Sequence, residues 1–162
     1  MRAVNVGGTG KLAMADLRAV CSEAGFGRVE TYIASGNVVF DSALPEAKVK
    51  SKLERRLREH GGKAIAVVVR SGTEMRAILK ANPFAKAVPN RTYAIFLDAR
   101  PPADALKRAT GVKDEEMRLG KREIYVHYPS GLGRSKLRIP AAKAGTARNM
   151  NTVAALADMA SK

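Results

Sequence analysis

A stretch that combines glycines, a hydroxyl and two cations lies in the C-terminal third of the chain. Residues 131–136 read Gly-Leu-Gly-Arg-Ser-Lys. Glycine lets a ligand approach the backbone closely, and serine, arginine and lysine side chains donate hydrogen bonds to anions. The candidate anion-binding residues are Gly133, Arg134, Ser135 and Lys136, with Arg148 and Asn149 as further donors nearby in sequence. A solvated basic loop that caps a helix explains the same residues, so both interpretations stay open.

A second glycine-rich segment, Gly7-Gly8-Thr9-Gly10-Lys11, lies between a predicted strand and a predicted helix. The first backbone N–H groups of a helix can hold a phosphate, and Lys11 adds a positive charge. We therefore include Gly7, Gly8 and Lys11 among the candidate anion-binding residues. The segment is no P-loop, because Asn5 and Leu12 occupy positions that need glycine and a hydroxyl residue. Turn formation alone also explains these glycines.

The residues that could catalyse a reaction are few. His127 is the one plausible general base in a predicted ordered element, and a half-exposed strand histidine explains it as well. Glu115 and Glu116 point to opposite faces of a strand, which disfavours an acid–base pair. The lone cysteine, Cys21, lies on the apolar side of a predicted helix, where we expect it to be buried. We assign no catalytic residue, and we expect neither a metal nor a cofactor.

Positive charge is concentrated near the C-terminus. The chain of 162 residues has a net charge of +14. Residues 118–148 contain eight basic side chains and one acid, Glu123. A field of this sign attracts polyanions and phosphorylated ligands, although basic surfaces also serve solubility. The basic residues of this segment are Arg118, Lys121, Arg122, Arg134, Lys136, Arg138, Lys143 and Arg148.

The expected partners are a nucleic acid or a phosphorylated small molecule. The predicted first strand, residues 2–6, has no aromatic residue and the third, residues 37–42, has only Phe40, so the aromatic platform of an RNA-recognition domain is absent. Any nucleic-acid binding should therefore depend on backbone contacts and on salt. No run of about 18 apolar residues is present, so we expect no membrane contact and a cytoplasmic location.

The first half of the chain predicts the elements β-α-β-β-α-β. Short strands are expected over 2–6, 28–34, 37–42 and 64–70, and helices over 14–24 and from Pro45 to Gly61. Apolar residues recur at helical spacing in both helices, and Ser35-Gly36-Asn37 favours a tight hairpin turn. The Asn37 amide could instead face a ligand. This order is that of a ferredoxin-like unit, residues 1–70.

The second half, residues 71–162, predicts a helix through Met75 and Ile78, followed by β-α-β-β-α. Strands are expected over 92–98, 115–119 and 122–128, with helices around Leu106 and at the C-terminus. Residues 131–148 show only weak periodicity. The fold class is therefore α+β, with a ferredoxin-like βαββαβ unit, a second βαββα unit packed against it, and antiparallel hairpins. We expect the two subdomains to form one compact unit.

Four segments together resemble a bacterial protein family known as domain of unknown function 1697. The segments are 4–8, 31–40, 133–137 and 146–153. The resemblance extends from Arg2 to about Met159. It implies a cytoplasmic α+β fold built on ferredoxin-like units, without an assigned reaction, cofactor or catalytic residue. The first strand is usually longer in this family, so a truncated start is expected here, and Met150 stands where an aromatic residue is usual.

Three functions are consistent with these observations. The leading hypothesis is a non-enzymatic module that binds an anionic ligand, either nucleic acid or nucleotide, through the basic 118–148 segment. The second is an enzyme for a phosphorylated or carboxylated small molecule, with the loops at 7–11 and 131–136 facing one cleft. The third is a structural or protein-interaction module that uses an exposed sheet edge.

Overall fold

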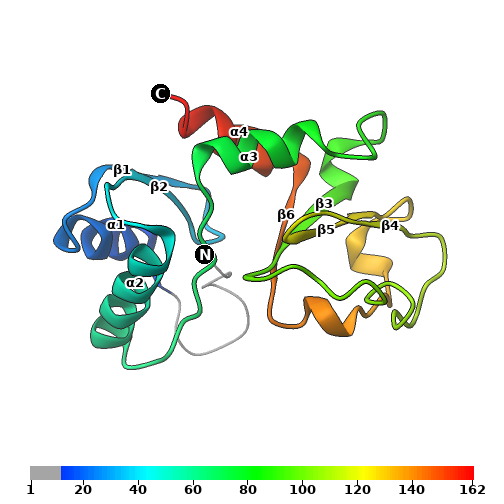
Figure 1. The fold of residues 1–162 in the computed structure, drawn as a ribbon, viewed down its shortest axis with the longest axis horizontal. Helices are drawn as coiled ribbons and strands as arrows, with labels where there is room; N and C mark the ends of the chain where they lie inside the picture. Colours follow the sequence, from blue (N-terminus) through cyan, green and yellow to red (C-terminus); the bar gives the residue numbers. More distant parts are fainter. Residues whose placement is uncertain (1–11) are drawn as a thin grey trace. The chain divides into compact units, whose positions relative to one another are not determined.

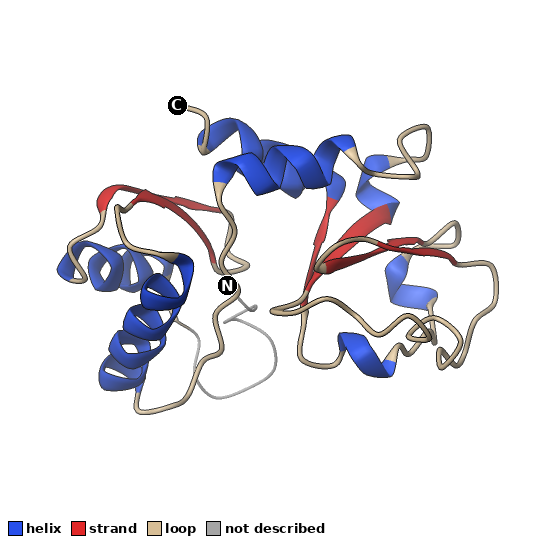
Figure 2. Cartoon of the chain, in the orientation of Figure 1, coloured by secondary structure: helices blue, strands red, loops and turns tan. Residues whose placement is uncertain are grey.

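The computed structural model describes residues 12–162, and these residues divide between two compact units (Figure 1). Among the described residues, the first unit is 12–71 with Met159–Lys162, and the second is Gly72–Asp158. Each unit combines helices with an antiparallel sheet, so the fold class is α+β, as predicted (Figure 2).

The first unit contains two helices and one β-hairpin. Its elements are α1 (Met14–Glu23), β1 (Gly27–Tyr32), β2 (Asn37–Asp41) and α2 (Glu46–Gly61). All four were predicted, the helices from their apolar spacing and the strands from the hairpin signal at Ser35-Gly36-Asn37. Leu17, Cys21, Leu53 and Leu57 are almost fully buried in one apolar cluster. This core fixes which face of each helix points inward and leaves the charged face of α2 in solvent.

Helix α2 shows how local sequence sets both ends of an element. Val49, Leu53 and Leu57 recur every four residues and form its buried face. The helix begins after Pro45, whose ring restricts φ and whose carbonyl accepts the Val49 N–H at 3.0 Å. It ends at Gly62, which has a φ of 67° and donates its N–H to Arg58 O at 2.8 Å. Glycine adopts this left-handed conformation without a steric penalty.

The ferredoxin-like arrangement of residues 1–70 stays a prediction. The described sheet of this unit has two strands, β1 and β2. The predicted strand 2–6 lies outside the described residues. Residues 64–70 were predicted as a strand, but they form no strand in the described part of the chain. Val67 and Val68 are nevertheless buried, and the Val67 N–H donates to Glu54 Oε1 at 2.9 Å instead of to a neighbouring strand.

The second unit is built on a four-stranded antiparallel sheet of strand order β4-β5-β3-β6. The strands are β3 (Thr92–Phe96), β4 (Glu116–Leu119), β5 (Glu123–His127) and β6 (Thr146–Asn149). The α-helices are α3 (Gly72–Lys80) and α4 (Met150–Met159), and the single 3-10 turns are η1 (Pro89–Arg91), η2 (Leu132–Arg134) and η3 (Pro140–Ala142). Strands β4 and β6 are the two edges of this sheet.

Two of these elements differ from the sequence prediction. The expected helix around Leu106 is a series of turns with i→i+3 hydrogen bonds, such as Ala105 N to Pro102 O at 3.0 Å. Strand β6 was not predicted, because Thr-Ala-Arg-Asn has no apolar alternation of its own. It forms because its backbone pairs with β3, where Ala147 lies opposite Ile95. The second unit therefore does not have the predicted element order β-α-β-β-α.

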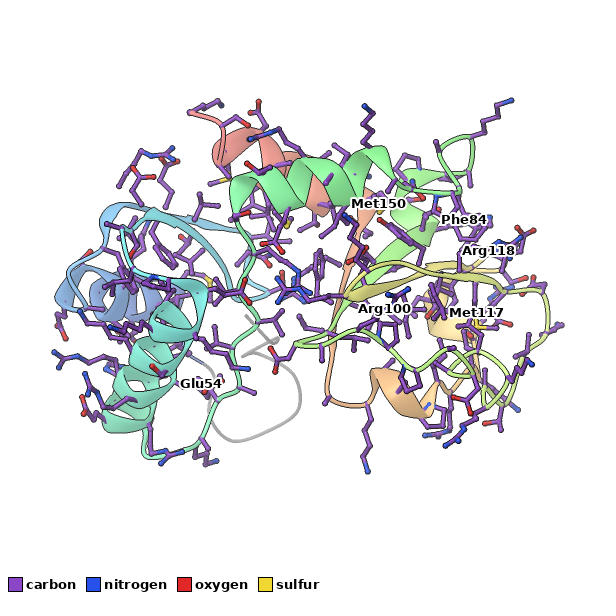
Figure 3. The ribbon with its side chains drawn as sticks, viewed as in Figure 1. Glu54, Phe84, Arg100, Met117, Arg118 and Met150 are labelled. Carbon is purple, nitrogen blue, oxygen red and sulfur yellow. The ribbon has the colours of Figure 1, made fainter. Side chains whose placement is uncertain are left out.

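The two faces of the four-stranded sheet are covered by different parts of the second unit. On the loop face, Ile124 and Val126 pack with Leu137 and Ile139 from the long segment after β5. On the helix face, the Tyr125 hydroxyl donates to Ile78 O of α3 at 2.8 Å. Figure 3 shows Met117 and Arg118, neighbours on β4, on opposite sides of the strand. Alternation along each strand thus decides which candidate residues can meet.

Candidate functional site

The candidate loop at 131–136 belongs to a longer basic segment on the loop face of the sheet. After η2, the chain runs through Ser135 with an extended φ of −77° and ψ of 138°. We define residues 134–138 as the basic ribbon. Its even-numbered side chains, Arg134, Lys136 and Arg138, are all exposed. The side chains between them turn inward, since Leu137 packs against the core of the sheet.

Hydrogen bonds attach the basic ribbon to residues 110–115. Thr110 and Arg138 form an isolated antiparallel bridge with two backbone hydrogen bonds of 2.9 Å. The Ser135 hydroxyl donates to Glu115 Oε1 and accepts from the Leu137 N–H at 3.1 Å. Close by in sequence, Ser130 donates to Asp114 Oδ2 at 2.5 Å. The ribbon is thus held along its length by main-chain and side-chain bonds.

Gly111 is the residue that lets the two segments approach so closely. Its φ is 69°, a conformation that other residues rarely adopt. A Cβ at this position would lie 2.8 Å from the carbonyl carbon of Lys136 and closer still to its oxygen. Only glycine therefore fits against the basic ribbon here.

Glu115 is the charged group beneath the ribbon. It is 8% exposed. The Ser135 hydroxyl and the Lys113 N–H, which donates at 2.7 Å, lower the pKa of its carboxyl because they stabilise the charged form. Glu115 therefore remains ionised in mildly acidic solution and keeps the ribbon fixed. The Ser135 hydroxyl donates its proton to Glu115 and not to a ligand, although the sequence made it a candidate ligand donor.

The cations of the basic ribbon have no acidic partner among residues 12–162. Arg134, Lys136 and Arg138 form no salt bridge there. In contrast, Arg122 pairs with Glu74 of α3 at 2.5 Å. The basic 118–148 segment thus contains Arg122, which is paired with an acid, and the three cations of the basic ribbon, which form no salt bridge with a described acid.

Arg148 does not join the basic ribbon. It lies opposite Ala94, which lies opposite Tyr125, so Arg148 shares the helix face with Tyr125. The ribbon covers the other face. Arg148 is 7% exposed, and its guanidinium donates to Thr146 Oγ1 and Ala147 O at 2.7 Å each. Burial lowers its pKa because the charged form loses hydration.

The remaining candidate residues have structural roles or lie outside the described residues. Asn149 accepts the Thr152 N–H at 2.9 Å on its Oδ1 and so caps the first turn of α4. Gly133 is exposed in η2, beside the ribbon. Gly7, Gly8 and Lys11 precede the first described residue, so the predicted anion site at 7–11 stays a prediction. The structure therefore groups Gly133, Arg134 and Lys136, places Arg148 on the other face of the sheet, and uses the Asn149 side chain as a helix cap.

Arg138 is a site residue that the sequence analysis counted as charge but did not select. Its signal was available in the alternation Arg-Ser-Lys-Leu-Arg, in which every second residue is cationic. That alternation became informative only once the segment proved to be extended.

The Asn37 side chain forms hydrogen bonds within its own hairpin turn. Asn37 is 6% exposed, and its Nδ2 donates to Tyr32 O at 3.2 Å and to Ser35 Oγ at 2.8 Å. Gly36 takes the positive φ of 79° that the turn requires. The hairpin-turn interpretation of this segment is thus confirmed, and the Asn37 amide is turned inward.

His127 is held by one hydrogen bond on β5. Its Nδ1 lies 3.1 Å from Thr92 Oγ1, and that hydroxyl donates its single proton to Val88 O at 3.1 Å. Nδ1–H must therefore be the donor to Thr92, which leaves the lone pair on Nε2. The ring is half-buried, with the Phe84 ring centroid 6.1 Å away. This orientation suits a proton acceptor as well as a packed strand residue.

Other potential sites in the described residues offer less chemistry. The Cys21 thiol is fully buried, which raises its pKa to about 12 and leaves it unreactive. Residues 12–162 contain no group of three or more acidic, histidine or cysteine side chains placed to hold a metal ion. No helix within this range is long and apolar enough to cross a membrane. An open groove in the first unit is lined by Phe26, Asp41, Leu44 and Lys52, among others.

The chain is similar to a bacterial protein of known structure. A solved structure titled as conserved bacterial protein SP0830 from Streptococcus pneumoniae matches it with a TM-score of 0.80 and 27% sequence identity. The match covers 98% of this chain and 94% of that one. No curated protein matches the chain. The family model described as "Protein of unknown function (DUF1697)" matches residues 1–125, and the chain therefore belongs to that family, as its sequence motifs predicted.

Proposed function

We propose that this protein binds an anionic ligand, a nucleic acid or a nucleotide, through the basic ribbon of residues 134–138. The observation that carries this proposal is the presence of three outward cations at alternate positions, with no salt bridge to any described acid. Unpaired surface cations raise the local concentration of polyanions and lose little when they bind one, because no existing ion pair has to break.

The fixed backbone of the ribbon supports the same conclusion. Its bridge to Thr110 and the bond between Ser135 and Glu115 hold the backbone that carries the cations in place before a ligand arrives. A ligand that meets such a surface loses less conformational entropy on binding than one that must order a loop. The absence of aromatic residues from 129–139 makes the binding depend on phosphates and not on bases.

The experiment is a titration of a fluorescent 20-nucleotide single strand, followed by anisotropy at about 50 mM and about 200 mM salt. The R134A/K136A variant should bind about tenfold more weakly at the lower salt concentration. The charge-matched control is K48A/R58A, which removes two exposed cations from α2. It should bind within about twofold of the unmodified protein. Absence of binding at low salt, or equal losses in both variants, would contradict the proposal.

A second candidate function is an enzyme in which His127 acts as a general base. The bond from Nδ1 to Thr92 supports it, because that bond fixes the tautomer whose Nε2 can accept a proton. The test is the NMR titration of the His127 ring in the unmodified protein and in T92V. A fixed tautomer should show Nδ1 protonated at neutral pH and a mixture of tautomers once the hydroxyl is removed. Mixed tautomers in both proteins would remove this basis.

A further inference from the structure

The basic ribbon has a regular repeat along the chain. Arg134, Lys136 and Arg138 are exposed, whereas Leu137 and Ile139 belong to the apolar cluster of the loop face. Ser135, between the first two cations, turns toward Glu115. This is the alternation of an extended chain with one face on the protein and one face in solvent. The outward face of this ribbon consists of cations at every second position.

The repeat has a defined length because the backbone is extended and fixed. Ser135 has strand-like φ and ψ angles, and Arg138 pairs with Thr110 as in an antiparallel ladder. Two residues of such chain advance roughly 6.6 Å. Gly111 lies close against the Lys136 backbone and helps to hold the centre of the ribbon in place. The backbone positions of the three cations therefore form a short comb with a set spacing.

That spacing selects among polyanions. Consecutive phosphates on one strand of a nucleic acid are separated by a full sugar and lie at nearly the same distance as the comb's cations. In inorganic polyphosphate the phosphorus atoms share bridging oxygens and lie at less than half that distance. A comb with the longer repeat can place one cation on each of three consecutive nucleic-acid phosphates, whereas on polyphosphate it meets at most every second phosphate.

We infer that Arg134, Lys136 and Arg138 bind three consecutive phosphates along a single strand of nucleic acid, without reading its bases. This inference rests on the proposed function and makes it more specific. Guanidinium groups at both ends can bind a phosphate through two N–H groups, and the central ammonium adds a third contact. Because phosphates carry no sequence information, the site should accept different base sequences with similar affinity.

The test uses a labelled ten-nucleotide thymidine strand with two unlabelled competitors, the same oligonucleotide and linear polyphosphate of ten phosphates. The key variant is K136A/A144K, which keeps the net charge but moves the central cation to exposed Ala144, outside the comb. A second variant, K136R, keeps both the charge and its position. Circular dichroism of each variant shows whether it is folded.

We expect polyphosphate to compete at least about twofold less well than the oligonucleotide at equal phosphate concentration, because at least half of its phosphates have no cation of the comb opposite them. K136A/A144K should bind the strand about fivefold more weakly, and the slope of log affinity against log salt should fall from about −2 to about −1.4, as expected for two contacts in place of three. K136R should bind like the unmodified protein, and a mixed-base strand should bind like the thymidine strand.

The outcomes separate this inference from the proposed function. If polyphosphate competes as well as the oligonucleotide and K136A/A144K binds normally, the ribbon attracts anions in general and the comb is wrong. If neither polyanion binds at low salt, both proposals fail. A strong preference for one base sequence would also overturn the comb, because a site limited to phosphates cannot produce it.

Discussion

Helix α2 and the basic ribbon have similar local charge in the sequence but present it differently. In α2, Glu54 lies 3.8 Å from Lys50, and Glu59 lies 3.9 Å from Arg55 and 3.5 Å from Arg56. A helix places residues three and four positions apart side by side, so interspersed acids reach the cations. An extended ribbon separates its neighbours, and its outward cations find no acid. Availability of charge therefore depends on whether acids are interspersed among the cations, as in α2 but not in residues 124–157, and on a backbone geometry that brings them within reach.

The two regions also differ in what holds them to their units. Helix α2 is attached by apolar side chains such as Leu53 and Leu57, each 1% exposed. The basic ribbon is attached by Leu137 and Ile139, by the Ser135–Glu115 bond and by a close backbone contact at Gly111. The position of α2 thus depends on the burial of its apolar side chains. The position of the ribbon depends also on the Ser135–Glu115 hydrogen bond and on the close backbone contact at Gly111.

The largest expected effect tests the apolar attachment of α2. Replacement of Leu53 by alanine should lower the free energy of unfolding by about 2–5 kcal/mol, because it removes buried methyl groups and leaves a cavity. Urea denaturation followed by circular dichroism measures this change. L44A, at an exposed leucine of the same unit, serves as the control and should change stability by less than about 0.5 kcal/mol.

The next effect tests the close contact beneath the ribbon. Replacement of Gly111 by alanine should cost about 2–4 kcal/mol of unfolding free energy, since the Cβ meets the Lys136 carbonyl in a conformation unfavourable to alanine. The matched variant is G61A in α2, where the new Cβ would meet no atom within 4 Å. It should be neutral or more stable by up to about 1 kcal/mol. Equal stability of G111A and the unmodified protein would show that the two segments are not tightly joined.

A smaller effect is expected from the serine that links the ribbon to Glu115. S135A should lower the unfolding free energy by about 1–2 kcal/mol, because a mostly buried carboxylate loses a hydrogen bond. The comparison is S51A in α2, whose hydroxyl bonds to Lys48 O of the same helix and is exposed. That change should lie within about 0.5 kcal/mol, and a larger loss for S51A than for S135A would contradict this account.

The smallest effect concerns pH. Because the pKa of folded Glu115 lies below that of the unfolded chain, its contribution to stability is present above the unfolded value, about 4.3. The contribution is lost as the pH falls through the folded value. Between pH 6 and pH 3, E115Q should therefore lose less unfolding free energy than the unmodified protein. Identical pH dependence in parallel urea titrations of the two proteins would show that Glu115 is not stabilised in its charged form.

The sequence alone determined much of this protein. The apolar spacing of α1 and α2, the turn at Gly36, the β4–β5 hairpin and the burial of Cys21 follow from residues close together in the chain. The family follows from four short segments taken together. Periodicity and turn chemistry are local properties, so they can be predicted without knowledge of distant contacts.

Tertiary structure decided the rest. Strand β6 exists because β3 supplies its hydrogen bonds, and Arg148 is buried because of the face on which that pairing places it. The segment around Leu106, after Pro101 and Pro102, forms turns instead of the predicted helix. The cations of residues 134–138 became a candidate site because Thr110, Gly111 and Glu115 fix that segment as an extended ribbon. The pairing of β6 and the fixed position of the ribbon depend on partners at least 20 residues away, which a local pattern does not specify.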